Sequence, residues 1–237
     1  TGSIAVNSDL KDWAKSYLWC SNVIYLSNFI INPIVQNKEV KLKGINGKRI
    51  VCVANLRPQK NHKLLIESAC LIKEKHPDWT FHLFGKDFED DYSKEIKERV
   101  SELNLLETVF FYGTIENVAS TLKQCDIAVL PSLSEGLPLA ILEYGLNKLP
   151  VIATNVGEIP KIIKSGKEGL IVESNHVNQF TEAILKFIEN EDFRNEMSSA
   201  LNTKIESNFS EESIIKEYIL WLHSLINFTK KIYFRHT

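Results

Sequence analysis

Two acidic residues and two basic residues carry the clearest chemistry in this sequence. Glu135 and Glu143 lie eight positions apart, the first in a predicted turn and the second among apolar helical residues. A buried carboxylate is costly unless it accepts hydrogen bonds or pairs with a cation. Glu143 therefore either faces a pocket and binds a pair of neighbouring hydroxyls, as on a ribose, or lies on a partly exposed helix in contact with water.

The two basic residues, Arg57 and Lys60, share one loop after a predicted strand at 50–54. If this loop lies opposite the turn at 136–138, the two side chains would clamp a diphosphate. Arginine would supply a planar pair of donors and lysine a point charge. The alternative is a surface loop that carries two solvated cations.

The stretch LPSLSEGLPLAILEY at 130–144 predicts the element order of an anion site. An apolar strand ends at Leu130 and a turn follows at Gly136. A helix then resumes with Pro138 in its first turn, where a missing N–H costs nothing. Free N–H groups and the positive end of the helix dipole attract anions at such a point. Gly136, Leu137 and Pro138 are therefore candidate substrate-binding residues.

Other predicted strand ends add four candidate substrate-binding residues: Asn55, Gly85, Gly113 and Thr114. A ligand can approach Gly85 closely because glycine has no side chain, and Gly113 with Thr114 would offer backbone groups to the edge of a base. Ordinary turn glycines explain the same pattern equally well. The sequence has no metal-ligand histidine spacing, no Walker loop and no GxGxxG turn, which argues against an NTPase and a standard dinucleotide dehydrogenase.

Composition sets the broad class of the protein. The 237 residues are 44% hydrophobic and 24% charged, with a net charge of -2, which is ordinary for a globular protein and gives no general nucleic-acid footprint. No apolar run approaches the roughly 20 residues of a membrane span. The four cysteines have neither CxxC nor zinc spacing, so we expect a cytoplasmic protein with reduced thiols, buried at Cys52 and Cys125.

The elements around the candidate residues alternate between strand and helix. Strands are predicted at 50–54, 80–84, 109–112, 127–130, 151–153 and 169–172, with helices between them and further helices near 177–189, 190–207 and 211–228. Short, non-alternating apolar strands joined by helices predict a Rossmann-like doubly wound parallel sheet of the α/β class. Its ligands bind at the carboxyl ends of the strands. A helix at 8–19 and a strand at 23–26 come before a polar linker and look detached from this unit.

Together these residues resemble the C-terminal, donor-binding half of a retaining GT-B glycosyltransferase of family 4, the group 1 glycosyltransferases. The main motif is the E-x7-E pattern from Glu135 to Glu143. Supporting stretches stand in the family's order at 55–60, 84–85, 111–113, 126–132, 156–160 and 169–172. The resemblance covers roughly residues 49–225. It implies a remnant of the preceding domain at 1–33 and a donor-binding domain, with a C-terminal crossing helix, at 34–237.

The resemblance also implies roles. Glu143 would bind the ribose of a nucleoside-diphosphate sugar, Glu135 would hold the donor sugar, and Gly136 and Leu137 would meet the distal phosphate or the sugar. Arg57 and Lys60 would neutralise the leaving diphosphate, so no metal or other cofactor is expected. The implied reaction moves a sugar to an acceptor with retention, in bacterial polysaccharide or glycolipid synthesis. The acceptor domain would be missing, so the fragment alone should be inactive.

Two departures from the family pattern and two alternative functions stay open. The family often has arginine where Asn55 stands, and Lys161 reverses a charge near the site. The alternatives are a GT-B sugar-nucleotide epimerase and a non-catalytic interaction module that keeps the fold. The tail at 230–235 mixes basic and aromatic residues. It is either a frayed terminus or a peripheral contact of the full-length enzyme with the inner face of the membrane.

Overall fold

Six parallel strands form the sheet on which the candidate residues lie. Their order across the sheet is β5-β4-β3-β6-β7-β8. The strands are β3 Arg49–Val53, β4 Thr80–Phe84, β5 Val109–Phe111, β6 Ile127–Leu130, β7 Val151–Thr154 and β8 Leu170–Val172. The central strands are buried along almost their whole length, because helices cover both faces of a doubly wound sheet. The α/β class and the parallel sheet predicted from the sequence are confirmed.

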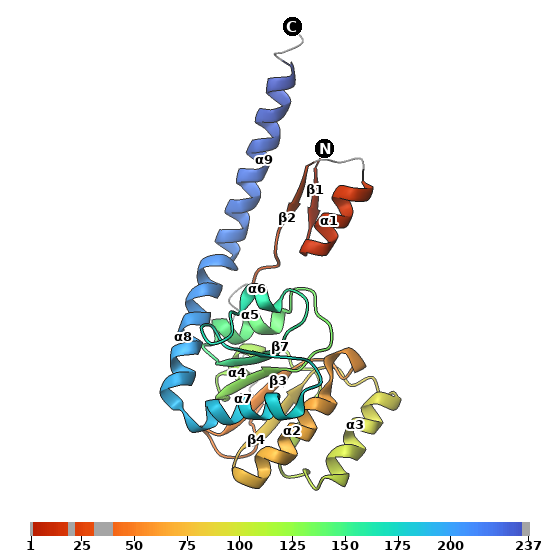
Figure 1. Ribbon diagram of the computed structural model, residues 1–237, viewed down its shortest axis with the longest axis vertical. Coiled ribbons are helices and arrows are strands. Elements are labelled where there is room, and N and C mark those ends of the chain that lie inside the picture. Colours follow the sequence, from red (N-terminus) through yellow and green to blue (C-terminus); the bar gives the residue numbers. More distant parts are fainter. Residues whose placement is uncertain (1, 19–21, 31–39, 234–237) are drawn as a thin grey trace. The chain divides into compact units, whose positions relative to one another are not determined.

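The helices lie in two layers around this sheet. Figure 1 shows α2 His62–Lys75, α3 Asp91–Glu102 and α7 Val177–Glu189 on one face. It shows α5 Leu139–Leu146 and α6 Ile159–Ile162 on the other. The short helices η1 Pro58–Lys60 and α4 Val118–Leu122 complete the connections. The sequence of α2 favours a helix because its buried residues recur every three or four positions. They form one stripe that packs against the sheet.

The order of the strands reverses between β3 and β6. The chain builds outward from β3 to β5, then returns to the other side of β3 and builds outward again to β8. The two central strands pair through Ile50 with Ile127 and Val51 with Ala128. Their carboxyl ends therefore meet at the topological switch point, where an open parallel sheet leaves a crevice for ligands.

The structure is a computed structural model that describes residues 2–18, 22–30 and 40–233, with side chains to residue 226. It divides into one unit of Thr1–Ile31 with Ile205–Thr237 and a second of Asn32–Lys204. The predicted domain at 34–237 includes the C-terminal helices, whereas this division assigns Ile205–Thr237 to the first unit. Its boundary at residues 33 and 34, Cys20, and the side chains of the basic and aromatic tail lie outside the described residues.

The first unit contains a two-stranded parallel sheet and the C-terminal helix. Its elements are β1 Ser3–Ala5, α1 Ser8–Tyr17, β2 Val23–Tyr25 and α9 Glu211–Tyr233. Strand β1 was not predicted, because three residues carry too little periodicity to be recognised. None of the described helices has the length and apolar character needed to cross a membrane.

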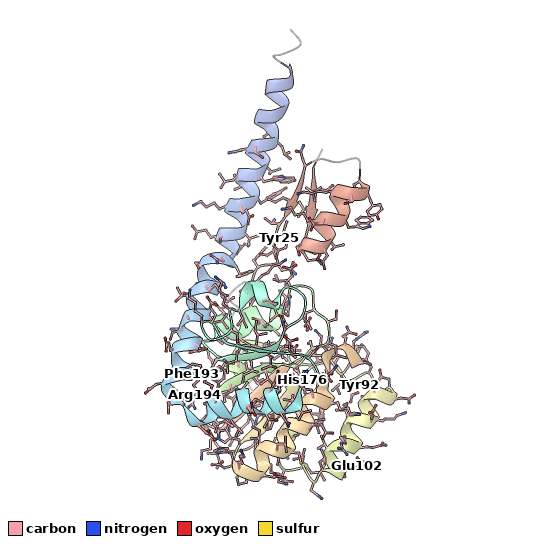
Figure 2. The ribbon with its side chains drawn as sticks, viewed as in Figure 1. Tyr25, Tyr92, Glu102, His176, Phe193 and Arg194 are labelled. Carbon is pink, nitrogen blue, oxygen red and sulfur yellow. The ribbon has the colours of Figure 1, made fainter. Side chains whose placement is uncertain are left out.

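Helix α8 Glu191–Asn208 begins against the end of α7. The rings of Phe187 and Phe193 are 5.9 Å apart, and Arg194 Nη1 donates a hydrogen bond to the Phe187 carbonyl at 3.1 Å. Figure 2 labels Phe193 and Arg194 at this corner. The contact ends α7 and turns the chain, because the arginine satisfies a carbonyl that the helix leaves free.

Two histidines are buried in the second unit and bear no charge at neutral pH. Burial is the main cause that lowers the pKa of His62 to about 4 and that of His82 to about 3. Thr80 Oγ1 lies 2.9 Å from His82 Nε2, and Tyr112 Oη lies 3.0 Å from its Nδ1. The two thiols expected to be buried, Cys52 and Cys125, are buried and free.

These histidines predict a loss of stability in mild acid. The unfolded chain takes up a proton near pH 6.5, whereas the folded chain does so only at the lowered pKa values. The stabilisation is therefore complete above about pH 6.5 and decreases as the pH falls, by about 1.4 kcal/mol per pH unit for each histidine. Urea unfolding between pH 7 and pH 5 measures this slope. The variant His82→Gln should have about half the wild-type slope, and an unchanged slope would contradict the assignment.

Candidate functional site

A cavity of about 350 Å³ opens where β3, β4 and β6 end and α5 begins. It is lined by Val53, Ala54, Asn55, Lys60, Phe84, Gly85, Leu130, Glu135, Leu137, Pro138, Leu139, Ala140 and Glu143. Both acids of the E-x7-E pattern and one cation of the basic loop therefore face one shared space. The cavity lies at the topological switch point of the sheet, which is where open α/β sheets ordinarily bind ligands.

Glu135, which lines this cavity, is held by two donors. Its Oε1 atom accepts hydrogen bonds from Lys60 Nζ and Ser132 Oγ, both at 2.6 Å. The Glu135 side chain is only 8% exposed, so the ion pair is strong and its geometry well defined. Among the described residues, none donates to the other carboxylate oxygen, Oε2, which remains available to a ligand hydroxyl.

Glu143 has a different environment, one turn and a half into α5. Burial raises the pKa of its carboxyl above the ordinary value, because low polarity disfavours the charged form. Within the described part of the chain, no side chain pairs with this carboxyl. Its neighbours Leu142 and Tyr144 are fully buried, whereas Glu143 itself is half-buried and lines the cavity. The arrangement suits a carboxylate that accepts hydrogen bonds from a bound molecule.

The first turn of α5 offers backbone donors to the same cavity. Pro138 occupies the N-cap position, so the prediction that it lies in the first helical turn is wrong by one residue. Leu139 and Ala140 follow it and line the cavity. No described residue accepts a hydrogen bond from either of their N–H groups, as expected at a helix N-terminus. These free donors and the helix dipole favour an anion at this point.

Backbone hydrogen bonds tie the Glu135 loop to the loops on both sides of it. Leu133 N–H donates to the Gln59 carbonyl at 2.8 Å, and Glu158 N–H donates to the Gly136 carbonyl at 3.2 Å. Gly157 has a φ of +55°, and a Cβ atom there would lie 1.8 Å from the Glu135 carbonyl oxygen. A glycine is therefore required at this contact on both conformational and steric grounds.

We predict that Gly157→Ala destabilises the protein more than Gly113→Ala. Both glycines have positive φ, but a Cβ at Gly113 would meet no atom within 4 Å. Gly113→Ala should therefore cost only the backbone strain of about 1 kcal/mol, and Gly157→Ala about 1–2 kcal/mol more because the Glu135 loop must move. Urea unfolding measures both values. Equal losses would show that the loop tolerates the displacement.

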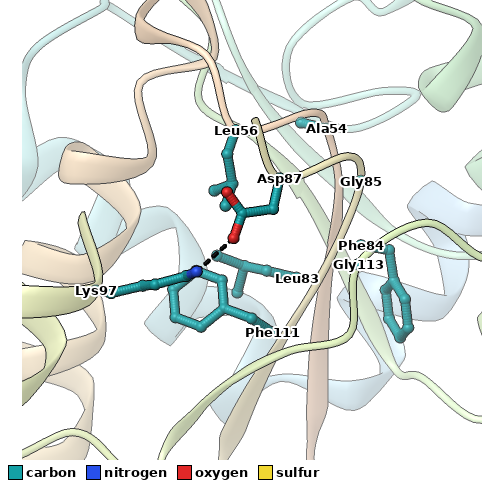
Figure 3. Close-up of a pocket in the computed structure, with 9 residues that line it drawn as sticks. All are labelled: Ala54, Leu56, Leu83, Phe84, Gly85, Asp87, Lys97, Phe111 and Gly113. Atoms are coloured by element: carbon teal, nitrogen blue, oxygen red, sulfur yellow. Dashed lines mark hydrogen bonds and ion pairs between the residues drawn. The ribbon is translucent and has the colours of Figure 1, made fainter. Parts of the chain in front are cut away.

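A second cavity, of about 320 Å³, adjoins the first and shares Ala54, Phe84 and Gly85 with it. Figure 3 shows its apolar wall, which includes Leu56, Leu83 and Phe111, and the ion pair between Asp87 and Lys97, which also line it. Gly113 also lines it. A Cβ at Gly85 would lie 2.2 Å from the Ala54 carbonyl oxygen. The missing side chain there allows the close contact between the ends of two strands.

The structure separates the two cations that the sequence analysis grouped. Lys60 lines the first cavity, whereas the exposed Arg57 lies with its guanidinium 4.2 Å from the centre of the Phe88 ring and lines neither cavity. Asn55 lines the first cavity, and its Oδ1 accepts a hydrogen bond from Lys86 N–H at 2.8 Å. Of the two cations predicted to form a clamp, only Lys60 lines the first cavity in this conformation.

Most of the other predicted residues lie at the two cavities, and some lining residues were missed. Gly136 and Thr114 are not among the lining residues. Asp87 and Lys97, which line the second cavity, were not predicted. Ser132, which bonds to Glu135 but lines neither cavity, was not predicted either, although it stands three residues before Glu135, where a loop side chain can reach back to it. Among the described residues, no group of three histidine, cysteine, aspartate or glutamate side chains could hold a metal ion.

Fold and site together define an α/β domain with an acid pair, a half-buried lysine and a helix N-terminus at its switch point. A family model described as glycosyl transferases group 1 matches residues 35–203. The chain belongs to this family. Its structural neighbours are GT-B glycosyltransferases, so the GT-B fold expected from the sequence is confirmed.

Three similar proteins illustrate the relationship. The UDP-Gal:alpha-D-GlcNAc-diphosphoundecaprenol alpha-1,3-galactosyltransferase of Escherichia coli is 30% identical over 185 residues, which cover 75% of this chain and 47% of that protein. The C-terminal domain of LpcC, a glycosyl transferase group 1 family protein from Francisella tularensis, superimposes with a TM-score of 0.64 at 27% identity. The match covers 70% of this chain and 89% of that domain. Anabaena HepE, solved with UDP and glucose, shares the fold with a TM-score of 0.78 at 19% identity, covering 93% and 62%.

Proposed function

We propose that this chain is the donor-binding half of a retaining glycosyltransferase of family 4, and that a nucleoside-diphosphate sugar lies in the first cavity. The supporting observation is that Glu135, Glu143 and Lys60 line one space at the switch point of the sheet. The chain spans about half the length of the E. coli relative. The acceptor site would therefore belong to a further domain of a longer protein.

In this proposal the diphosphate lies against the start of α5. The free N–H groups of Leu139 and Ala140, with that of Leu137, supply donors, and Lys60 supplies the positive charge. Transfer leaves a nucleoside diphosphate with increased negative charge on its terminal phosphate, and preorganised donors stabilise that charge as it develops. The lysine and the helix would do this without a metal ion.

The two acids would then bind the two sugar rings of the donor. Glu143 is half-buried and has no side-chain partner among the described residues, so the vicinal hydroxyls of a ribose would satisfy its carboxylate. Glu135 Oε2 would accept a hydrogen bond from a hydroxyl of the transferred sugar, while Lys60 and Ser132 donate hydrogen bonds to Oε1. The second cavity, with Gly85 and Gly113 at its edge, would receive the base.

The proposed acceptor is a lipid- or polymer-linked sugar of a bacterial surface polysaccharide or glycolipid. The E. coli relative is named for a diphosphoundecaprenol acceptor, which supports this class. Transfer by the isolated chain should be absent or very slow, because the acceptor would have no binding site next to the donor.

Thermal unfolding with UDP, GDP and ADP tests the donor site on the chain as it stands. A nucleotide at about 100 times its dissociation constant should stabilise the folded state by roughly 2.7 kcal/mol. At least one of the three should raise the melting temperature of the wild type, and none should raise that of Glu143→Ala to the same extent. The absence of any shift at millimolar concentration would overturn the proposal.

A further inference from the structure

Tyr144 places a hydroxyl group between the two central strands of the sheet. It follows Glu143 in α5 and is 0% exposed. Val53 N–H of β3 donates a hydrogen bond to Tyr144 Oη at 2.6 Å, and the hydroxyl donates to the Val129 carbonyl of β6 at 3.4 Å. One side chain from a helix therefore joins two neighbouring strands that would otherwise bond to each other.

The register of these strands shows what the hydroxyl replaces. In a parallel pair, the N–H of one residue donates to the carbonyl of the residue before its partner. Its own carbonyl accepts a hydrogen bond from the N–H of the residue after that partner. With Val51 paired to Ala128, the next bond of the ladder would run from Val53 N–H directly to the Val129 carbonyl. The β3 and β6 pairing stops before that bond, and Tyr144 Oη occupies its place.

We propose that Tyr144 is a positioning residue whose hydroxyl holds the ends of β3 and β6 apart and so keeps the donor cavity open. Val53 at the end of β3 and Leu130 at the end of β6 both line that cavity. Their separation sets its width, and Glu143 beside Tyr144 in α5 moves with the same helix. The link to donor binding rests on the proposed function above, but the spacing of the strands does not.

The chemistry of the hydroxyl fits this role. Burial is the main cause that raises the pKa of Tyr144 well above its ordinary value, so the group keeps its proton and can donate to Val129 while it accepts from Val53. A buried N–H without an acceptor is costly. Removing the hydroxyl should therefore drive the strands together, so that Val53 N–H reaches Val129 directly.

The variant Tyr144→Phe tests the spacing without any ligand. Its crystal structure should show the Val53 nitrogen at about 3 Å from the Val129 oxygen, the length of a direct ladder bond, and a narrower cavity. Strands that keep their wild-type separation, with or without a water molecule in place of the hydroxyl, would overturn the proposal. Urea unfolding of the variant confirms beforehand that it is folded.

Titration with UDP tests the consequence for binding. Tyr144→Phe should weaken UDP binding about tenfold, which is about 1.4 kcal/mol. The matched control is Tyr92→Phe, which also removes a hydroxyl that accepts a backbone N–H bond, from His62 at 2.9 Å, but lines neither cavity. The control should bind UDP within about twofold of the wild type.

The outcomes separate the two proposals. Strands that close in Tyr144→Phe while UDP affinity is unchanged would overturn the claim that the spacing serves the donor. An equal loss of affinity in Tyr92→Phe would show a general loss of stability and would overturn it as well. A wild type that binds no nucleoside diphosphate would overturn the proposed function, and the crystal structure of the variant would still decide whether Tyr144 sets the spacing.

Discussion

Replacing Lys60 by alanine is expected to weaken UDP binding at least about 100-fold, a loss of about 2.7 kcal/mol. Lys60 is the described cation that lines the first cavity, with its half-buried side chain placing Nζ 2.6 Å from Glu135 Oε1. Its removal deletes the positive charge opposite the proposed diphosphate. It also leaves the Glu135 carboxylate buried without its partner, and breaking such pairs is strongly destabilising or costly for binding.

Isothermal titration of the variant with UDP measures this effect, and urea unfolding measures the accompanying loss of stability. The matched control is Lys73→Ala, which removes a lysine that donates to the Asn104 carbonyl and should leave UDP affinity within about twofold. Arg57→Ala should reduce UDP affinity far less than Lys60→Ala does, because the Arg57 side chain lies over the Phe88 ring. Losses of the same size would mean that Arg57 leaves the ring and enters the cavity when the nucleotide binds.

The second large effect concerns Glu143, where stability and binding should change in opposite directions. Because burial raises the pKa of this carboxyl, ionising it in the folded state costs more than in the unfolded chain. That cost grows as the pH rises from the ordinary carboxyl pKa through the raised one, so it is fully present at neutral pH. Glu143→Gln should therefore melt at a higher temperature than the wild type at pH 7 without ligand.

The same substitution should weaken UDP binding about 30- to 100-fold, because hydrogen bonds from the ribose to a charged acceptor are lost. UDP affinity of the wild type should also fall as the pH drops through the raised pKa, whereas that of Glu143→Gln should stay flat. Titrations at pH 7 and pH 5 check both statements. The exposed residue Glu74 supplies the control Glu74→Ala, and a variant that is less stable yet binds UDP normally would contradict the assignment.

The sheet and the position of the acid pair could be predicted because they depend on local patterns. The run Ile127–Leu130 is uniformly apolar and buried on both faces, and it ends at Pro131, which cannot continue the ladder. A turn and an apolar helix after such a strand place Glu135 and Glu143 at the same edge of the sheet. The helix expected between the strands at 50–54 and 80–84 is α2, His62–Lys75.

Other features could not be predicted because they depend on where loop side chains turn. Arg57 and Lys60 lie three residues apart, but a single turn of η1 sends one to the Phe88 ring and the other to Glu135. Spacing alone does not determine such directions. The contacts of the Tyr144 hydroxyl with the two strands could not be predicted either, since an aromatic residue in an apolar helix is ordinarily a core residue.

The backbone contacts around the Glu135 loop have a consequence for engineering the preference for the proposed donor. The Gln59 carbonyl on one side and the Gly157 segment on the other fix this loop through backbone contacts, which depend on the path of the chain more than on side-chain identity. A chimera that imports residues 131–138 alone from a relative would carry a loop shaped for different neighbours. The segments after β3, β6 and β7 contact one another through their backbones, so they should be exchanged together.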